Sequence, residues 1–154
     1  MSKIAPITLS AVQTDDFEQL VEIRIAAMRE SLERIGRFDP ERARERFRQG
    51  FSPEHTRFIE INGRKVGFVV VKPVLNQLLL DHLYVLPKAQ RKKVGSQVLA
   101  HIFIEADTQG LPIRVGALKD SDSNRFYQRH GFRRIEQDEF DNYYIRHTIR
   151  NIDS

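Results

Sequence analysis

The chain has 154 residues, 40% of them hydrophobic and 30% charged, a composition typical of one folded domain and unlike that of a disordered chain or a membrane protein. It contains no cysteine, which excludes disulfide bonds, thiolate nucleophiles and cysteine-ligated metal centres. The 25 basic and 21 acidic residues leave a net charge of +4, which favours anionic partners.

The amino terminus and the apolar runs bear on localisation. The first six residues contain no apolar segment of the kind found in secretory signal peptides. The longest apolar run, residues 66–71, is far too short to cross a bilayer. We therefore expect a cytoplasmic protein without a membrane partner, folded as a single domain over residues 1–154.

Residues 7–12 are expected to form a strand, which leads into a first helix. Thr14 or Asp15 provides the helix cap, with Glu18 as the capping-box partner of Asp15. Gly36 ends this helix. Its apolar stripe consists of Phe17, Leu20, Val21, Met28, Leu32 and Ile35.

A second helix and a hairpin follow. Asp39 caps the helix and Pro40 takes its first position, while Ala43, Phe47 and Phe51 recur four residues apart on one face. The period then changes to two. Asn62-Gly63 separates strand-like runs at residues 58–61 and 65–71, and both central positions of a type I′ turn require positive φ, so this segment predicts a hairpin.

The second half of the chain alternates strands with helices. Strands are expected at residues 78–86, 113–118, 132–135 and 143–149, the first of them central and ending at Pro87. A longer helix ends at Gly110 and a short one, capped within residues 121–123, ends at Gly131. The longer helix has a stripe of Val94, Val98, Ile102 and Ala106. The order β-α-α-β-β-β-α-β-α-β-β indicates an α/β domain with a mixed sheet.

The segment between the central strand and the next helix carries the strongest functional signal. A strand that passes through a basic, glycine-ended loop into a helix directs backbone N–H groups and the positive end of the helix dipole at one point. Such a point suits a pyrophosphate. The alternative is a solvated basic turn that precedes an amphipathic helix.

This loop resembles motif A of the GNAT superfamily of N-acetyltransferases, Q/R-x-x-G-x-G/A, with Gln90 first and Gly95 last. Lys93 stands where the motif has its middle glycine. If that position needs a positive φ, lysine there costs on the order of 1 kcal/mol, while its ammonium can face a phosphate. Residues 124–132 resemble motif B, N-x-x-(F)Y-x-x-x-G-F, and the order of elements extends the resemblance over residues 7–149.

The resemblance implies a single-domain GNAT-like α/β fold: a mixed, largely antiparallel central sheet of six or seven strands flanked by about four helices. It also implies an enzyme that passes the acetyl group of acetyl-CoA to a primary amine, which the sequence does not identify. The family's cofactor pairs with the central strand like an extra strand, here with the backbone of Leu83, Tyr84 and Val85. The remaining cofactor contacts implied by the motifs are Gln90, Arg91, Lys92, Lys93, Val94, Gly95, Ser96, Asn124 and Tyr127.

Two proton transfers require side chains. The departing thiolate, with a pKa of about 8.5 if it resembles cysteine, benefits from a phenol donor, and Tyr127 occupies the family's general-acid position. The alternative for Tyr127 is a half-buried helix residue that packs on the sheet. An alkylammonium acceptor has a pKa of about 10.4, so a base or a water relay must remove its proton.

Asp81 and His82 are the expected bases. Family members often have an acidic residue or a histidine at the position of Asp81, and the pKa of a histidine already lies near neutrality. Strand alternation places His82 with Tyr84 on one face and Asp81 on the other, and a bulge would exchange the faces. The alternative for both is a strand residue paired with a neighbouring arginine or lysine.

Arg24 interrupts the inward stripe of the first helix. GNAT-like folds border their acceptor site with the first two helices, so Arg24 is interpreted either as an anchor for an acceptor carboxylate or as an arginine at the edge of the stripe. The histidines have no metal-ligand spacing, and we expect no metal.

Two other classes of protein remain open. A non-catalytic acyl-CoA-binding module with this fold fits the same motifs. A nucleic-acid-binding protein would fit only the positive charge, because the sequence has none of the usual binding motifs, and we expect no nucleic-acid partner. Dimers are common in the family, so a homodimer is among the expectations.

Overall fold

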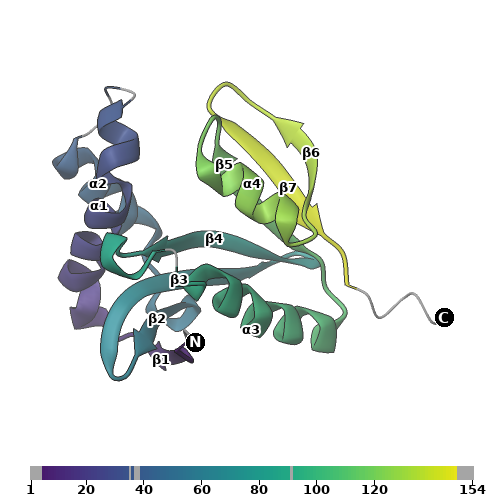
Figure 1. Ribbon diagram of the computed structural model, residues 1–154, viewed down its shortest axis with the longest axis horizontal. Coiled ribbons are helices and arrows are strands. Elements are labelled where there is room, and N and C mark those ends of the chain that lie inside the picture. The colour runs from purple at the N-terminus through teal and green to yellow at the C-terminus, as the bar shows by residue number, and fades with distance from the viewer. Residues whose placement is uncertain (1–4, 35, 37–38, 91, 149–154) are drawn as a thin grey trace. The chain divides into compact units, whose positions relative to one another are not determined.

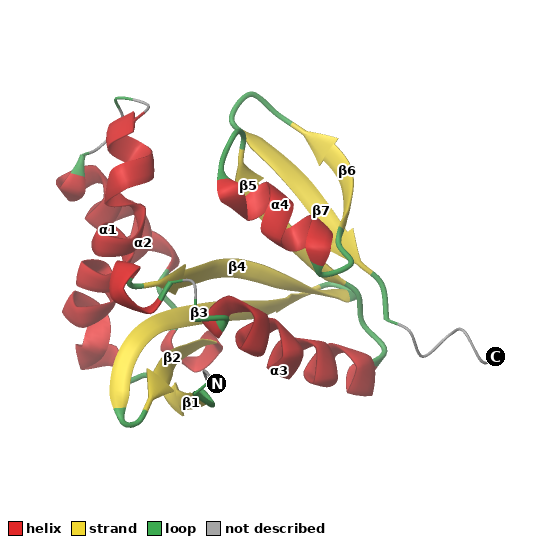
Figure 2. Cartoon of the chain, viewed as in Figure 1, coloured by secondary structure: helices red, strands yellow, loops and turns green. Residues whose placement is uncertain are grey.

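A computed structural model of the chain describes residues 5–34, 36, 39–90 and 92–148 (Figure 1). The chain divides into two compact units. The first comprises Met1–Val70 and His82–Val98, and the second Val71–Asp81 and Leu99–Ser154. We describe each unit by itself. Figure 2 shows the helices, strands and loops by colour.

The order of elements is the one expected from the sequence. The strands are β1 (Thr8–Ala11), β2 (Thr56–Ile61), β3 (Arg64–Val74), β4 (Gln77–Val85), β5 (Ile113–Leu118), β6 (Arg133–Gln137) and β7 (Asp141–Arg146). The helices are α1 (Phe17–Arg34), α2 (Pro40–Gly50), α3 (Val94–Gln109) and α4 (Asp122–Arg129), with single 3-10 turns η1 (Thr14–Asp16), η2 (Pro53–His55) and η3 (Pro87–Ala89).

The strands form one mixed sheet in the order β1-β2-β3-β4-β5-β7-β6. Strand β4 runs parallel to β5, whereas β1 with β2, β2 with β3, β5 with β7, and β6 with β7 are antiparallel. The expected α/β class, with a largely antiparallel sheet of six or seven strands and about four helices, is therefore confirmed.

Helices α1 and α2 lie side by side and enclose an aromatic core in the first unit. Phe17 stacks on Phe47 with ring centroids 5.7 Å apart, and Phe47 contacts Phe68 of β3 at 5.5 Å. Phe17 is partly buried, and the buried members of this core besides Phe47 and Phe68 are Val12, Leu20, Val21, Ile23, Phe58 and Val70. Apolar side chains at helical spacing on α1 and α2 thus pack on the period-two faces of the strands, as the sequence indicates.

Most of the predicted start and stop signals are confirmed. Asp39 caps α2 by accepting a hydrogen bond from the Arg42 N–H at 3.1 Å, and Pro40 is the first helical residue. Asn62 and Gly63 have φ values of 51° and 79°, as a type I′ turn requires. Gly110 follows α3 with a φ of 71°. The predicted stripe of α3 is buried along its whole length.

The predicted cap of the first helix is wrong. The cap is Gln13 rather than Thr14 or Asp15, and the Gln13 N–H donates to the Asp16 carboxylate at 2.8 Å. The reason is that η1 leads into α1 without a break, so the uncapped N–H groups lie before the apolar stripe begins.

Strands β3, β6 and β7 differ in length from the expectation. Strand β3 continues through Pro73 to Val74 and turns tightly at Leu75, which has a φ of 55°. Strands β6 and β7 end at Gln137 and Arg146. Of the residues predicted in the first helix and last strand, Ile35 and Ile149 lie outside the described residues.

Asp138 fixes the turn between β6 and β7 in the second unit. Its carboxylate accepts hydrogen bonds from the N–H groups of Phe140 and Asp141 and from the Tyr143 hydroxyl at 2.7 Å. The Tyr143 hydroxyl lowers the pKa of Asp138, and the same bond raises the pKa of Tyr143 to about 12. The phenol therefore stays protonated throughout the neutral range and holds the hairpin closed. Of the helices in the described part of the chain, none has the length and apolarity needed to cross a membrane.

Candidate functional site

The loop that leaves β4 is folded back on the end of that strand. The Ala89 N–H donates to the Leu86 carbonyl at 2.9 Å, and the Gln90 N–H donates to the same carbonyl at 3.2 Å. The Gln90 side chain donates to the Val85 carbonyl at 2.9 Å. The first residue of the predicted anion-binding motif therefore fastens the loop to the strand. Arg91 lies outside the described residues.

Lys93 connects the loop to α3 in the left-handed backbone region, with a φ of 60°. Its carbonyl accepts the first helical hydrogen bond, from the Gln97 N–H at 3.1 Å, so Lys93 is the cap position of α3. The N–H groups of Val94 and Gly95 then lie in the first helical turn, where no carbonyl of the helix can accept them. Anion binding at this helix start stays a prediction, while the positive φ explains why the motif favours glycine at the position of Lys93.

Replacement of Lys93 by glycine is expected to stabilise the fold by about 1 kcal/mol, because the left-handed strain of a lysine disappears. For a chain of this length that is a rise in melting temperature of about 3 °C. Lys92→Gly is the matched control. Lys92 is not among the residues with positive φ, so glycine there only adds freedom to the unfolded chain and should lower the melting temperature. Equal effects of the two variants would contradict the assignment of strain to Lys93.

The backbones of β3 and β4 approach each other closely beside Tyr84. The Leu86 N–H donates to the Val66 carbonyl at 2.7 Å. A Cβ atom on Gly67 would lie 2.1 Å from the Tyr84 carbonyl oxygen, a distance that no side chain could adopt. Gly67 therefore sets the path of the strand segment, Leu83 to Val85, that the resemblance implies for the cofactor.

Arg24, Tyr84 and His82 form a polar cluster within the aromatic core of the first unit. The Tyr84 hydroxyl lies 3.1 Å from His82 Nδ1 and 3.4 Å from Arg24 Nε. The predicted placement of His82 and Tyr84 on one face of the strand is confirmed by their ring centroids, 5.4 Å apart. Phe47 packs edge-on against His82 at 5.6 Å, and Phe68 against Tyr84 at 5.3 Å.

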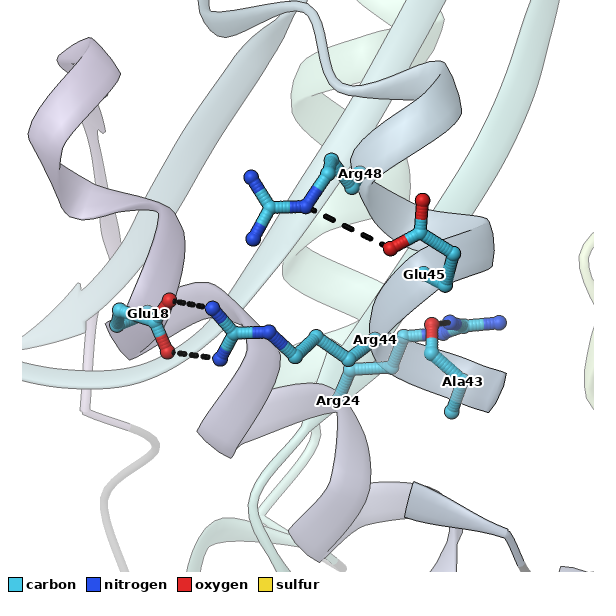
Figure 3. A network of polar contacts seen from close by, with 6 residues as sticks. All are labelled: Glu18, Arg24, Ala43, Arg44, Glu45 and Arg48. Carbon is cyan, nitrogen blue, oxygen red and sulfur yellow. Dashed lines mark hydrogen bonds and ion pairs between the residues drawn. The ribbon is translucent and has the colours of Figure 1, made fainter. Parts of the chain in front are cut away.

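Arg24 joins α1 to α2 as well as to β4. Its Nη1 donates to the Ala43 carbonyl at 2.7 Å, and Figure 3 shows the side chain reaching that carbonyl. Beside it, Arg44 forms a two-pronged ion pair with Glu18 that links the same helices. Arg24 is half-buried and hydrogen-bonded, unlike an arginine that extends into solvent from the edge of the stripe.

A shallow hollow lies between α1 and α2 next to Arg24. Its walls are almost entirely apolar. The lining residues are Arg24, Ile25, Met28, Leu32, Asp39, Pro40 and Ala43.

Asp81 lies in the second unit, where its carboxylate forms an ion pair with Lys72 at 3.3 Å. The side chain of Asp81 is 33% exposed and that of Lys72 is 24% exposed. The structure thus shows the pairing with a neighbouring strand that the sequence left open for Asp81. Its role as a base stays a prediction.

Asn124 is the centre of a hydrogen-bond network in the second unit. Its amide nitrogen donates to the carbonyls of Leu118 and Ser121, at 2.9 and 3.0 Å. Its amide oxygen accepts from Asn142 at 2.9 Å and from the Tyr144 hydroxyl at 2.8 Å. These bonds hold the start of α4 against β5 and β7. Cofactor binding by Asn124 stays a prediction beside this positioning role.

Tyr127 is buried on α4, with 6% of its surface exposed. Its ring packs against Phe126, Phe132 and Tyr144, with centroids 5.2, 5.3 and 6.4 Å away. The packing expected for a helix tyrosine is therefore present, and its role as general acid stays a prediction.

The predicted site residues fall into two groups, each assembled within one unit. The first group contains Arg24, His82, the Leu83 to Val85 backbone and the predicted anion loop, residues 90 and 92–96. The second group contains Asp81, Asn124 and Tyr127. The sequence indicates only a backbone role for Tyr84, whereas the structure also places its hydroxyl beside His82 and Arg24. The signal was present, because alternation already placed Tyr84 beside His82. The described residues contain no group of three metal-ligating side chains.

A family model for the acetyltransferase (GNAT) domain matches residues 52–134, more than half of the chain. The chain belongs to the GNAT acetyltransferase family. The match includes the anion loop and the segment that contains Asn124 and Tyr127. A search of curated protein sequences finds no match to this GNAT domain.

Solved structures share the fold of this GNAT domain at low sequence identity. The PaiA N-acetyltransferase of Thermoplasma acidophilum, solved in complex with coenzyme A, is 20% identical, with a TM-score of 0.76 over 96% of this chain and 99% of that one. An acetyltransferase of Thermus thermophilus is 17% identical, with a TM-score of 0.76 over 95% and 99%. The ribosomal-protein-S18-alanine N-acetyltransferase of Escherichia coli is 18% identical, with a TM-score of 0.67 over 90% of each chain.

Proposed function

We propose that this GNAT domain binds acetyl-CoA and transfers its acetyl group to a primary amine by direct attack of the amine on the thioester. The observation that supports the proposal is the left-handed cap at Lys93, which starts α3 at the loop, and helix N-termini of this kind favour anions such as the phosphates of the cofactor. The side chains of Lys92 and Lys93 add positive charge to the same loop. The coenzyme A complex of the Thermoplasma relative supports the choice of cofactor.

The reaction requires a base at the acceptor amine and an acid at the departing thiolate. The acceptor loses a proton, its nitrogen forms a bond to the acetyl carbon, and the carbon–sulfur bond then breaks. Tyr127 donates its phenolic proton to the departing thiolate. Of the two expected bases we favour His82, because the Asp81 carboxylate is already engaged in the ion pair with Lys72, whereas His82 lies beside Arg24 and Tyr84.

A melting experiment tests cofactor binding. Coenzyme A, acetyl-CoA and desulfo-CoA are each expected to raise the melting temperature, because a ligand that binds only the folded state stabilises it, by about 2.7 kcal/mol at 100 times its dissociation constant. Gly95→Val should abolish the effect, because the added side chain crowds the phosphates. The absence of a shift with millimolar coenzyme A would contradict the cofactor assignment.

Arg24→Met is expected to raise the acceptor KM while leaving the KM of acetyl-CoA unchanged. The Ala43 carbonyl and the Tyr84 oxygen accept two of the five guanidinium N–H donors, and we propose that the remaining donors bind an acceptor carboxylate. A charged hydrogen bond contributes about 1.5–3 kcal/mol, which corresponds to a change of roughly 10- to 150-fold. Steady-state kinetics with each substrate varied in turn measure the effect, and equal changes in both KM values would point to misfolding.

A non-catalytic acyl-CoA-binding module is the alternative function. It predicts the same melting shifts and no acetyl transfer, so turnover separates the two.

A further inference from the structure

We propose that the Tyr84 hydroxyl takes the proton of the acceptor amine and passes its own proton to Nδ1 of His82, while Arg24 holds the phenol in position. This inference rests on the proposed acetyl transfer and concerns how its base works. It gives the Tyr84 side chain a role separate from the backbone contact with the cofactor.

Three side chains from two elements meet at the Tyr84 hydroxyl. Tyr84 and His82 are two residues apart on β4, and their contact joins the phenol oxygen to Nδ1 at 3.1 Å. Arg24 on α1 approaches the same oxygen with Nε at 3.4 Å, and its guanidinium carbon lies 6.0 Å from the Tyr84 ring centroid. The Ala43 carbonyl on α2 anchors the guanidinium from its other side.

The direction of the hydrogen bonds follows from the donor inventory. A guanidinium only donates, so the Tyr84 oxygen accepts from Arg24. The phenol has a single proton, and its acidity exceeds that of a neutral imidazole N–H, so the O–H donates to Nδ1. A protonated His82 would instead direct a second cationic donor at the same oxygen, close to Arg24, and repulsion between the two cations opposes this. The cluster therefore favours a neutral His82 with its proton on Nε2.

This tautomer determines the route of the acceptor's proton. The Nδ1 lone pair is occupied by the Tyr84 hydroxyl, and Nε2 already carries a proton. Along this contact, a proton from the acceptor ammonium reaches His82 when the Tyr84 oxygen takes it and the phenolic proton moves to Nδ1 in the same step. The phenol is unchanged at the end, the amine nitrogen is left with a free electron pair, and His82 becomes an imidazolium that later releases its proton to water.

The surroundings suit such a transfer. Phe47 and Phe68 cover the two rings, at 5.6 Å from His82 and 5.3 Å from Tyr84. Apolar neighbours limit the access of water and strengthen the hydrogen bonds inside the cluster.

Nitrogen-15 NMR of the histidine side chains tests the tautomer without any acceptor. At neutral pH we expect His82 to show a bare Nδ1 and a protonated Nε2, with His82→Gln used to assign its signals. Tyr84→Phe keeps the packed ring, removes only the hydroxyl, and should shift the Nδ1 signal to that of a lone pair without a hydrogen bond. A protonated Nδ1 in the wild-type protein would overturn the inference.

A double-mutant cycle tests the proton transfer itself. With the fastest amine of a panel of L-lysine, spermidine, benzylamine and an alanine-initiated peptide, Tyr84→Phe and His82→Gln should each lower kcat by about 100-fold. The double variant should lose no more than either single one, because residues that act as a unit are not additive. Independent losses that multiply, or a full kcat in Tyr84→Phe, would refute the transfer.

The two experiments separate this inference from the proposed function. If no amine is acetylated, the proposed function fails and the proton transfer fails with it. The NMR result then still decides whether Arg24 and Tyr84 fix the tautomer of His82.

Discussion

Tyr127→Phe is expected to lower kcat by about 100-fold or more while leaving coenzyme A affinity unchanged. The substitution removes only the hydroxyl, so the ring still packs against Phe126, Phe132 and Tyr144. Loss of a general acid costs roughly 10²- to 10⁴-fold, because the thiolate then leaves without a proton. Isothermal calorimetry measures the affinity and steady-state turnover measures kcat.

Tyr143→Phe is the matched control for Tyr127→Phe. Tyr143 is another phenol of the second unit, but its hydroxyl is bound to Asp138 in the turn between β6 and β7. This variant should keep full kcat. An unchanged kcat in Tyr127→Phe, with chemistry shown to limit the rate, would leave Tyr127 with a packing role only.

Gly67→Ala is expected to have the largest effect on stability, a loss of about 3 kcal/mol in the free energy of unfolding. The added carbon would lie 2.1 Å from the Tyr84 carbonyl oxygen, and because that atom belongs to the backbone, β3 and β4 must move apart. The movement would displace the strand segment proposed to bind the cofactor, so coenzyme A binding should weaken as well. Urea unfolding measures the stability change.

Gly116→Ala serves as the control for Gly67→Ala. Its added carbon would lie 3.0 Å from the Tyr143 ring, a side chain that can move aside, so we expect a loss of about 1 kcal/mol. If Gly67→Ala lost no more free energy of unfolding than Gly116→Ala, the close approach of Gly67 to the Tyr84 carbonyl would not require a glycine.

Local sequence signals predicted most of the fold. Asp39-Pro40, Asn62-Gly63 and Gly110 specify their own backbone conformation through side-chain caps or positive φ, so their positions could be predicted without tertiary contacts. The backbone conformation of Lys93 could also be predicted locally, because the motif has a glycine at this position and glycine there indicates a left-handed residue. Its φ of 60° meets that condition.

The candidate site could be predicted only in part, because its contacts join distant residues. Arg24 and Tyr84 are 60 positions apart in the sequence, and Asn124 and Tyr144, which share a hydrogen bond, are 20 positions apart. A periodic pattern shows which face a residue occupies but not which side chain of another element it meets. The cap at Gln13 could not be predicted for a related reason. A 3-10 turn precedes the apolar stripe, and the spacing of apolar residues in the stripe does not show that the turn is there.

The most direct test of the account is acetyl-CoA turnover with the amine panel, followed by mass spectrometry of the products. We expect free coenzyme A and an N-acetylated amine to appear in equal amounts, and Tyr127→Phe to slow the formation of both about 100-fold while still binding coenzyme A. Tight binding of coenzyme A without acetylation of any amine in the panel would contradict the enzyme assignment and favour a non-catalytic acyl-CoA-binding module.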